Sequence, residues 1–523
     1  MTTARREEAS QVGPGNSDEL WMLNRRAVMR EEASGGLLYD FGSRRLASLR
    51  DVATYRVLQE LSAGATFDGA ISAAGVPSDQ AGLQRKTLAQ LAAAGFLVPG
   101  GDASSASVRP TTARGAVPES PAGSSTRRKA SSLVRFEAGL SAPICLTWEL
   151  TYACNLNCVH CLSSSGRRDP RELSTRECEA VIDELQRMRV FYINIGGGEP
   201  TVRPDFWHLI DYSVAHDVGV KFSTNGVLLD KARARRLAAN DYVDVQVSLD
   251  GATAEVNDRI RGAGSYATAL RALENLNDAG FQNAKLSVVV TRENVGQLDE
   301  LKGIADRYGA TLRLTRLRPA GRGADVWDQL HLLPDQQRRL YDWLVEAGEN
   351  VLTGDSFFHL SALGTRLPGM NLCGAGRVVC LIDPVGDVYA CPFAVHPTFR
   401  AGNLRDHEGL AQIWAESATF QQLRAPQETG LCGSCPAFDV CRGGCMAAKF
   451  FTGRRLDDPD PECALGHGDS VASRRTGPRP EPDDSHSRRP RASRTLLPIN
   501  PVRKTATACD PNPLAGLKFE TVV

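Results

Sequence analysis

The sequence predicts an α/β protein, a partial (β/α)6 barrel flanked by a winged-helix-like α+β domain and a cysteine-rich domain. Short apolar runs alternate with helical patterns between residues 138 and 330, and cysteines gather between residues 331 and 465. Extended segments precede three helical patterns between residues 20 and 100. With 523 residues the chain is long enough for several domains, since single hydrophobic cores stop growing at roughly 250–300 residues.

The first predicted domain spans residues 20–100. Extended segments surround a turn in residues 35–46, and three helical patterns follow at residues 52–61, 67–74 and 80–94. Gly95 comes directly after the third pattern, where a glycine commonly ends a helix in the left-handed conformation. Strands followed by three small helices indicate a winged-helix-like domain.

Two segments lack any hydrophobic periodicity. Residues 101–137 are rich in Ser, Ala, Pro, Gly and Arg, which predicts a flexible linker. Residues 466–523 are similar in composition until a mildly apolar end, so we expect them to be largely disordered.

The barrel prediction depends on six short runs of apolar and β-branched residues. They lie at residues 144–150, 191–195, 218–222, 243–249, 286–290 and 312–314. Helical patterns separate them, and this alternation builds a parallel sheet. Six such units make an incomplete barrel, whose active site would lie at the carboxyl ends of the strands.

The charge balance and the hydropathy pattern argue against several classes of partner. Lys plus Arg and Asp plus Glu each number 61, so the chain lacks the basic excess typical of nucleic-acid binding. The amino-terminal segment has no apolar signal region, and no run of about eighteen apolar residues could span a membrane. We therefore expect a soluble cytoplasmic protein that binds neither nucleic acid nor membrane.

The 14 cysteines are the most informative part of the composition. A cytosolic chain has little use for disulfides, so clustered thiols there suggest metal or redox chemistry. Eleven of the cysteines fall into spaced groups, whereas Cys145, Cys178 and Cys509 stand alone. We expect these three to be structural or incidental.

Cys154, Cys158 and Cys161 form a C-x3-C-x2-C run just after the first predicted barrel strand. Three thiolates can hold three irons of a [4Fe-4S] cube and leave the fourth iron without a protein ligand. That iron can chelate S-adenosylmethionine (SAM), so that the reduced cluster releases a 5′-deoxyadenosyl radical. The alternatives are a zinc site, which favours paired C-x2-C units, and a ferredoxin-type cluster, which uses C-x2-C-x2-C-x3-C.

This spacing resembles the signature of the radical SAM superfamily, in which the residue before the last cysteine is usually aromatic. Later strand ends carry further matches, including a Gly-Gly-Glu motif. The resemblance implies SAM contacts by His160, Gly197, Gly198, Glu199, Ser223, Asn225, Ser248, Asp250 and Arg261. Oxygens of the glycine motif would accept from the SAM ammonium, and Arg261 would pair with its carboxylate. Taken singly, these motifs are also compatible with ordinary turns between strands and helices.

A second cysteine array follows the barrel, with the pattern C-x12-G-x4-C, then C-x2-C-x5-C-x3-C and a last cysteine. It resembles the SPASM domain, the auxiliary-cluster module of radical SAM enzymes that act on peptides and proteins. By resemblance, two [4Fe-4S] clusters would be bound, the nearer by Cys373, Cys380, Cys391 and Cys445 and the farther by Cys432, Cys435, Cys441 and Cys463. Full thiolate ligation suits electron transfer rather than SAM binding. A structural zinc domain is the alternative.

Longer stretches resemble the mycofactocin radical SAM maturases. They are residues 147–170, 317–323, 373–393 and 441–451. The resemblance implies oxidative decarboxylation of the C-terminal tyrosine in a Val-Tyr-ended ribosomal precursor peptide, then carbon–carbon cross-linking of valine to the resulting tyramine unit. It also implies an electron donor such as a flavodoxin or ferredoxin. Alternatives are another SPASM-type maturase, thioether-forming or sulfatase-activating, and a non-catalytic leader-binding scaffold.

Residues 20–100 resemble the small peptide chaperone of the same pathway. The resemblance implies that this domain binds the precursor's leader as an added strand, a mode that relies on main-chain hydrogen bonds. Fusion through a linker would present the peptide at an effective concentration of about millimolar order. A DNA-binding winged helix is the alternative, but the last predicted helix offers only Arg85 and Lys86 as cations.

Overall fold

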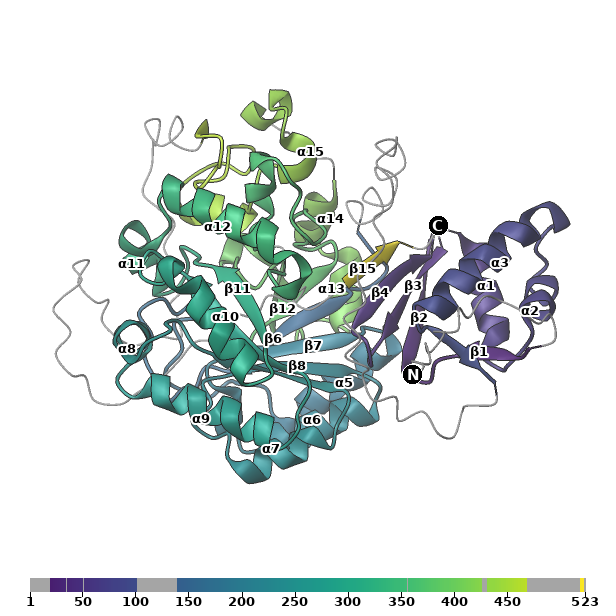
Figure 1. Ribbon diagram of the computed structural model, residues 1–523, viewed down its shortest axis with the longest axis horizontal. Helices are drawn as coiled ribbons and strands as arrows, with labels where there is room; N and C mark the ends of the chain where they lie inside the picture. The colour runs from purple at the N-terminus through teal and green to yellow at the C-terminus, as the bar shows by residue number, and fades with distance from the viewer. Residues whose placement is uncertain are drawn as a thin grey trace, which may run out of the picture. The chain divides into compact units, whose positions relative to one another are not determined.

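The computed structural model describes residues 19–33, 35–49, 51–100, 139–354, 356–425, 430–467 and 518–521. They divide into two compact units (Figure 1). The first unit holds the described residues up to Gly100 together with Lys518–Thr521, and the second holds those from Gly139 to His467. The predicted linker and most of the predicted tail lie outside the described residues.

The first unit combines two small sheets with three helices. Its strands are β1 (Trp21–Leu23), β2 (Ala27–Glu32), β3 (Gly35–Asp40), β4 (Arg45–Leu49), β5 (Leu97–Pro99) and β15 (Lys518–Thr521), and its helices are α1 (Val52–Leu61), α2 (Phe67–Ala73) and α3 (Ser78–Ala93). One sheet has the strand order β15-β4-β3-β2, and β1 pairs with β5. Asp51 caps α1 by accepting from the Thr54 amide, and Gly95 follows α3 with φ of 84°. The predicted strands and three helices are confirmed.

The second unit is built on parallel strands that follow one another in chain order. They are β6 (Cys145–Thr151), β7 (Tyr192–Gly197), β8 (Gly219–Thr224), β9 (Val243–Ser248), β10 (Ala284–Val290) and β11 (Thr311–Arg316). The helices are α5 (Thr175–Arg187), α6 (Phe206–Ala215), α7 (Lys231–Ala238), α8 (Ala254–Arg261), α9 (Ser265–Asp278), α10 (Leu298–Arg307), α11 (Gly323–Leu330) and α12 (Pro334–Ala347). The predicted α/β class with six parallel strands is confirmed.

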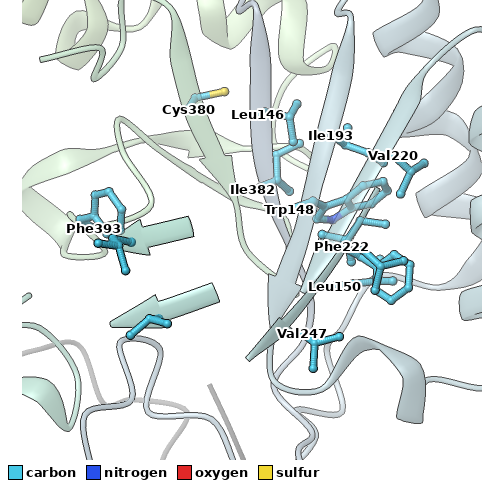
Figure 2. Packing of buried hydrophobic residues seen from close by; sticks show 14 of the residues in the cluster. Leu146, Trp148, Leu150, Ile193, Val220, Phe222, Val247, Cys380, Ile382 and Phe393 are labelled. Atoms are coloured by element: carbon cyan, nitrogen blue, oxygen red, sulfur yellow. The ribbon is translucent and has the colours of Figure 1, made fainter. Parts of the chain in front are cut away.

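Each barrel strand has an apolar side and a polar side, because side chains alternate along a strand. On β6, Trp148 and Leu150 pack with Phe222 in the apolar core (Figure 2). Thr147 and Glu149 alternate with them and are also buried. The sheet therefore separates an apolar layer under the helices from a polar interior.

The cysteine-rich segment continues the barrel sheet instead of forming a separate one. Strand β12 (Val379–Ile382) pairs in parallel with β6, and β13 (Asp387–Tyr389) and β14 (Arg400–Asn403) extend the sheet in antiparallel fashion. An open barrel leaves its first strand with an unpaired edge, and β12 covers that edge. After these strands, the described residues form the α-helices α13 (Leu410–Glu416), α14 (Ala418–Arg424), α15 (Phe438–Cys441) and α16 (Met446–Phe451). None of the helices in the described residues has the length and apolar content that a membrane crossing requires.

Candidate functional site

The loop that carries Cys154, Cys158 and Cys161 lies at the carboxyl end of β6, where the barrel prediction places the active site. Cys158 and Cys161 are buried, and Cys154 is partly exposed. The neighbouring Gly198 backbone touches this loop so closely that an added Cβ would overlap the Ala153 carbonyl and lie 3.1 Å from the Cys154 Cβ. Only glycine fits there, so Gly198 lets the ends of β6 and β7 approach each other.

Glu199 ties the glycine motif to the end of β8. Its buried carboxylate accepts from the Asn225 amide at 2.7 Å, from Thr224 Oγ1 at 2.9 Å and from Thr201 Oγ1 at 2.6 Å. Burial raises the pKa of Glu199, and the hydrogen bonds from these neighbours oppose that rise. Asn225 Nδ2 in turn donates to Asn155 Oδ1 in the cysteine loop at 2.7 Å. The Glu199 carboxylate therefore already accepts hydrogen bonds from the protein. Together with Asn225 it links the carboxyl ends of β6, β7 and β8.

Asp250 forms a second centre of contacts, at the end of β9. Its Oδ2 lies 2.7 Å from His160 Nε2 and 2.5 Å from Arg261 Nε, and its Oδ1 accepts from the Val289 amide at 2.7 Å. Burial opposes ionisation of Asp250, but Arg261 and His160 outweigh it and hold its pKa at about 2. Arg261 is thus paired within the protein, and its carbonyl oxygen lies 3.7 Å from Cys158 Sγ.

The segment after β11 holds the cysteine loop from the other side, and our sequence reasoning missed its role. Arg322 donates to the Cys158 carbonyl at 2.8 Å and to the Ser165 carbonyl at 3.0 Å. Gly321, with φ of 54°, lies against the Cys161 and Leu162 carbonyls, where any Cβ would overlap them. The two glycines of the glycine–arginine–glycine run in residues 321–323 are the sequence signal for this close backbone approach.

Two polar side chains inside the barrel point to a ligand. Ser223 Oγ and Gln246 Oε1 are buried and have no hydrogen-bond partner among the described residues. They lie opposite each other in the pairing of β8 with β9. Buried polar atoms are nearly always satisfied, so such a pair indicates that a bound molecule supplies the missing contacts.

The auxiliary cysteines form two groups of neighbours. Burial raises the pKa of the Cys391 thiol, and the neighbouring Cys373 and Cys445 add to the rise. Burial also raises the pKa of Cys441 to about 12, where Cys463 and Cys432 are among the neighbours that contribute. Cys435 belongs to the second group, because it contributes in the same way to the raised pKa of Cys432. Cys373, Cys391 and Cys445 are thus neighbours of one another, as are Cys432, Cys435, Cys441 and Cys463.

Cys380 has a different neighbouring thiol, Cys145. It is on β12, fully buried in the apolar core beside Leu146 and Ile382 (Figure 2). Burial raises its pKa above the ordinary range, and the neighbouring thiol that adds to this is Cys145 on β6. The pairing of β12 with β6 thus brings Cys380 next to Cys145.

An ion cluster fixes the end of the auxiliary region to the barrel. Arg316, the last residue of β11, forms a bidentate pair with Asp460 and contacts Glu462, and all three side chains are buried. Asp460 Oδ2 also accepts from the Cys445 amide at 2.7 Å. The ligand loops before Cys463 are therefore anchored to the rim of the barrel.

The candidate donors are free cysteine thiols, the ligands that iron–sulfur clusters use. No three of the described His, Cys, Asp or Glu side chains lie close enough together to hold one metal ion. A cube needs wider spacing than a single ion, because each thiolate binds a different iron. Gly198, Gly321 and Arg322 shape the backbone around the first group of thiols.

Comparisons with known proteins agree with this geometry. Residues 148–303 match the radical SAM superfamily model, residues 373–436 match the iron–sulfur cluster-binding (SPASM) domain, and residues 20–98 match the peptide chaperone MftB family. The structure of SuiB from Streptococcus suis bound to S-adenosylmethionine aligns with a TM-score of 0.59 at 17% identity, covering 84% of this chain and 99% of that one. The chain is a radical SAM enzyme with an auxiliary-cluster domain and a fused peptide-chaperone domain, and its cofactors are iron–sulfur clusters and SAM.

Sequence relatives define the family more narrowly. The chain is 69% identical over 358 residues to mycofactocin maturase MftC of Mycobacterium ulcerans, covering 68% of this chain and 97% of the relative. It is 64% identical over 382 residues to the protein of the same name from Mycolicibacterium smegmatis, with 73% and 97% covered. The chain belongs to the mycofactocin maturase family, whose members modify a peptide in mycofactocin biosynthesis. The predicted family and enzyme class are confirmed.

Proposed function

We propose that this enzyme oxidatively decarboxylates the C-terminal tyrosine of a Val-Tyr-ended precursor peptide and then joins the valine to the tyramine unit through a carbon–carbon bond. When bound, SAM and the clusters supply a 5′-deoxyadenosyl radical that can remove a hydrogen atom from unactivated carbon, and an acceptor for the electron left when carbon dioxide departs. The observation that carries the proposal is a cysteine loop locked at the barrel rim in a chain 69% identical to a mycofactocin maturase.

The residues around the cysteine loop divide into those that contact SAM and those that position it. Ser223, whose hydroxyl has no hydrogen-bond partner among the described residues, and Ser248 are the candidates for direct contact from the strand ends. Gly197 and Gly198 allow main-chain oxygens to approach the SAM ammonium. The Glu199 and Asp250 carboxylates hold Asn225, His160 and Arg261 in place, because protein donors already engage them.

Arg318 is the candidate partner for the peptide's terminal carboxylate. It follows β11, is buried, and its guanidinium lies 4.5 Å from the centre of the Phe393 ring. Its Nε has no hydrogen-bond partner among the described residues. The Phe393 amide donates to Cys391 Sγ at 3.5 Å, so Arg318 stands beside the nearer auxiliary thiols. A buried guanidinium with a spare donor suits a carboxylate, which it can bind through charge-assisted hydrogen bonds.

The auxiliary thiols would hold two clusters. Cys373, Cys391 and Cys445 contribute to the nearer cluster, and the group containing Cys432 and Cys463 holds the farther one. The fourth position of the nearer cluster is assigned to Cys380 by resemblance, whereas its thiol lies beside Cys145. Buried thiols with raised pKa values release protons when they bind iron, so cluster assembly favours higher pH.

The first unit would recognise the precursor, since it matches a peptide chaperone family. The leader would add as a strand to one of its sheets, and covalent fusion would keep the peptide near the barrel at about millimolar effective concentration. A flavodoxin or ferredoxin would deliver the electrons. The domain boundaries that we propose are residues 20–100, 138–330 and 331–465.

A direct experiment tests the proposed reaction. Anaerobically reconstituted and reduced enzyme is incubated with SAM and a precursor peptide that ends in Val-Tyr, and the peptide is followed by mass spectrometry. We expect first a product that has lost the mass of formic acid, because carbon dioxide and two hydrogens leave the tyrosine. A thioether product, or 5′-deoxyadenosine with no change in peptide mass, would contradict the proposal. A precursor ending in Val-Phe is the matched control, because it lacks only the phenol hydroxyl and so tests whether the reaction needs that group.

A further inference from the structure

The sheet of the first unit includes a strand from far along the chain. Strand β15 pairs in parallel with β4, with Lys518 opposite Arg45, Phe519 opposite Leu46, Glu520 opposite Ala47 and Thr521 opposite Ser48 (Figure 1). The strand order β15-β4-β3-β2 makes β4 an interior strand only because β15 covers it. Without β15, β4 would expose a row of main-chain donors and acceptors.

The β4 edge is well suited to bind an extended segment. Leu46, Ala47 and Leu49 are buried, and β4 pairs with β3 over residues 45–49. The backbone of β4 is therefore fixed before any further strand arrives. Strand addition draws its affinity from main-chain hydrogen bonds, which many different sequences can form.

We propose that the β4 edge is the strand-docking site of the first unit and that Lys518–Thr521 occupies it within the same chain, so that a substrate leader must displace this segment. The proposal rests on the proposed function, in which the leader binds as an added strand. Both segments use the same main-chain groups of β4, so they exclude each other.

The expected size of the competition follows from simple occupancy. Covalent attachment gives the segment an effective concentration of about millimolar order, which favours docking even for a short strand. A site that is occupied for about nine-tenths of the time binds a competitor roughly tenfold more weakly. The pairing of β15 with β4 covers only four residue pairs, so a longer leader strand can form more main-chain hydrogen bonds with β4 and displace β15.

The test uses proline in the full chain. Only every second N–H of a strand faces a given neighbour, so the double substitution Phe519→Pro and Glu520→Pro removes a main-chain donor whichever way the strand is oriented. The double substitution Phe519→Ala and Glu520→Ala is the matched control, because it keeps both N–H groups. Hydrogen exchange of the β4 amides and the dissociation constant of the full precursor peptide are measured for each variant.

We expect the proline variant to lose about tenfold or more of the exchange protection at outward-facing β4 amides, whereas the alanine variant keeps most of it. A synthetic peptide of residues 514–523 should restore protection in the proline variant. The precursor should bind the proline variant roughly tenfold more tightly than the wild-type chain.

Three results would count against parts of this picture. Unchanged β4 exchange in the proline variant overturns the docking of Lys518–Thr521. Lost protection without any gain in precursor affinity overturns the competition and directs the leader to another edge. Failure of the precursor to bind either variant overturns the leader-binding part of the proposed function. In that case the hydrogen exchange of the β4 amides alone tests whether Lys518–Thr521 docks on β4.

Discussion

The two thiol-bearing regions of the second unit are held in different ways. The loop of Cys154, Cys158 and Cys161 is held by close packing and by polar contacts. Glycine backbones pack against its carbonyl groups, Arg322 donates a hydrogen bond to it, and its His160 contacts Asp250. The auxiliary thiols are for the most part only partly buried, and one ion cluster around Asp460 anchors their region to the barrel.

The difference shows which region depends more on its metal. Hydrogen bonds specify the backbone of the first loop, so its shape is set by the protein itself. The auxiliary region has few long elements, and its thiols must lose protons before they can bind iron. Part of its folding free energy should therefore come from cluster binding. The two regions should respond differently to the same change of cysteine to alanine.

The largest expected effect separates the two regions. Cys158→Ala removes a ligand of the cluster that leaves one iron open to SAM, so we expect no 5′-deoxyadenosine above background. Cys435→Ala damages only the farther cluster, so some SAM cleavage should remain while the peptide product is lost. Chromatographic measurement of 5′-deoxyadenosine and of the peptide product in both variants checks this prediction. Equal loss of both activities in both variants would show that the regions do not act separately.

The second prediction concerns Arg318, which lies between the barrel and the nearer auxiliary thiols. We expect Arg318→Gln to weaken binding of the precursor by about ten- to a hundredfold, since a hydrogen bond to a charged group contributes roughly 1.5–3 kcal/mol. A precursor with a C-terminal carboxamide should bind wild-type and variant enzyme alike. If the variant still prefers the carboxylate to the carboxamide by the wild-type factor, Arg318 does not bind that group.

The sequence predicted the fold and the thiols well, because strong periodicity and cysteine spacing record them directly. The positions of Ser223, Asn225 and Asp250 at strand ends were also predictable from the parallel-strand pattern. What the sequence could not show is how side chains share their partners. Asp250 contacts both His160 and Arg261, and no local pattern in the sequence records that shared contact.

The sequence also did not indicate which strands pair when their residues lie far apart in the chain. Nothing in the local pattern of residues 379–382 indicates that they join β6 rather than form their own sheet, since the pairing partner is more than two hundred residues away. The strand at Lys518–Thr521 is the same case, because it lies in the mildly apolar end of a segment that we predicted to be largely disordered. Open sheet edges in the fold decide both pairings.

The third prediction uses Glu149, which lies on β6 where the two regions adjoin. Burial, with a contribution from Asp383, raises its pKa from 4.5 to about 8. The folded protein therefore keeps a proton that the unfolded chain releases, and this stabilisation is fully present below pH 4.5 and is lost as the pH rises toward 8.

Denaturant titrations at two pH values measure this effect. From about pH 5.5 to about pH 7.5, the wild-type free energy of unfolding should fall by about 2 kcal/mol more than that of Glu149→Gln, which cannot ionise. If the free energies of unfolding of the two proteins change equally with pH, Glu149 is charged in the folded state. The polar interior under the cysteine loop would then need a positive charge to balance it.

The smallest expected effect decides how many thiols the auxiliary region uses. Cys380 sits in the apolar core beside Cys145, so we expect Cys380→Ala to keep the wild-type iron content and to lower the free energy of unfolding by about 1 kcal/mol, as for a small buried apolar group. Cys391→Ala is the matched control and should lower the iron content by up to about four atoms per chain. Equal iron loss in both variants would restore Cys380 as the fourth ligand, which would require β12 to shift its thiol out of the core when the cluster binds. Unchanged iron in the Cys380 variant would mean that no thiolate of Cys380 is needed to assemble the nearer cluster.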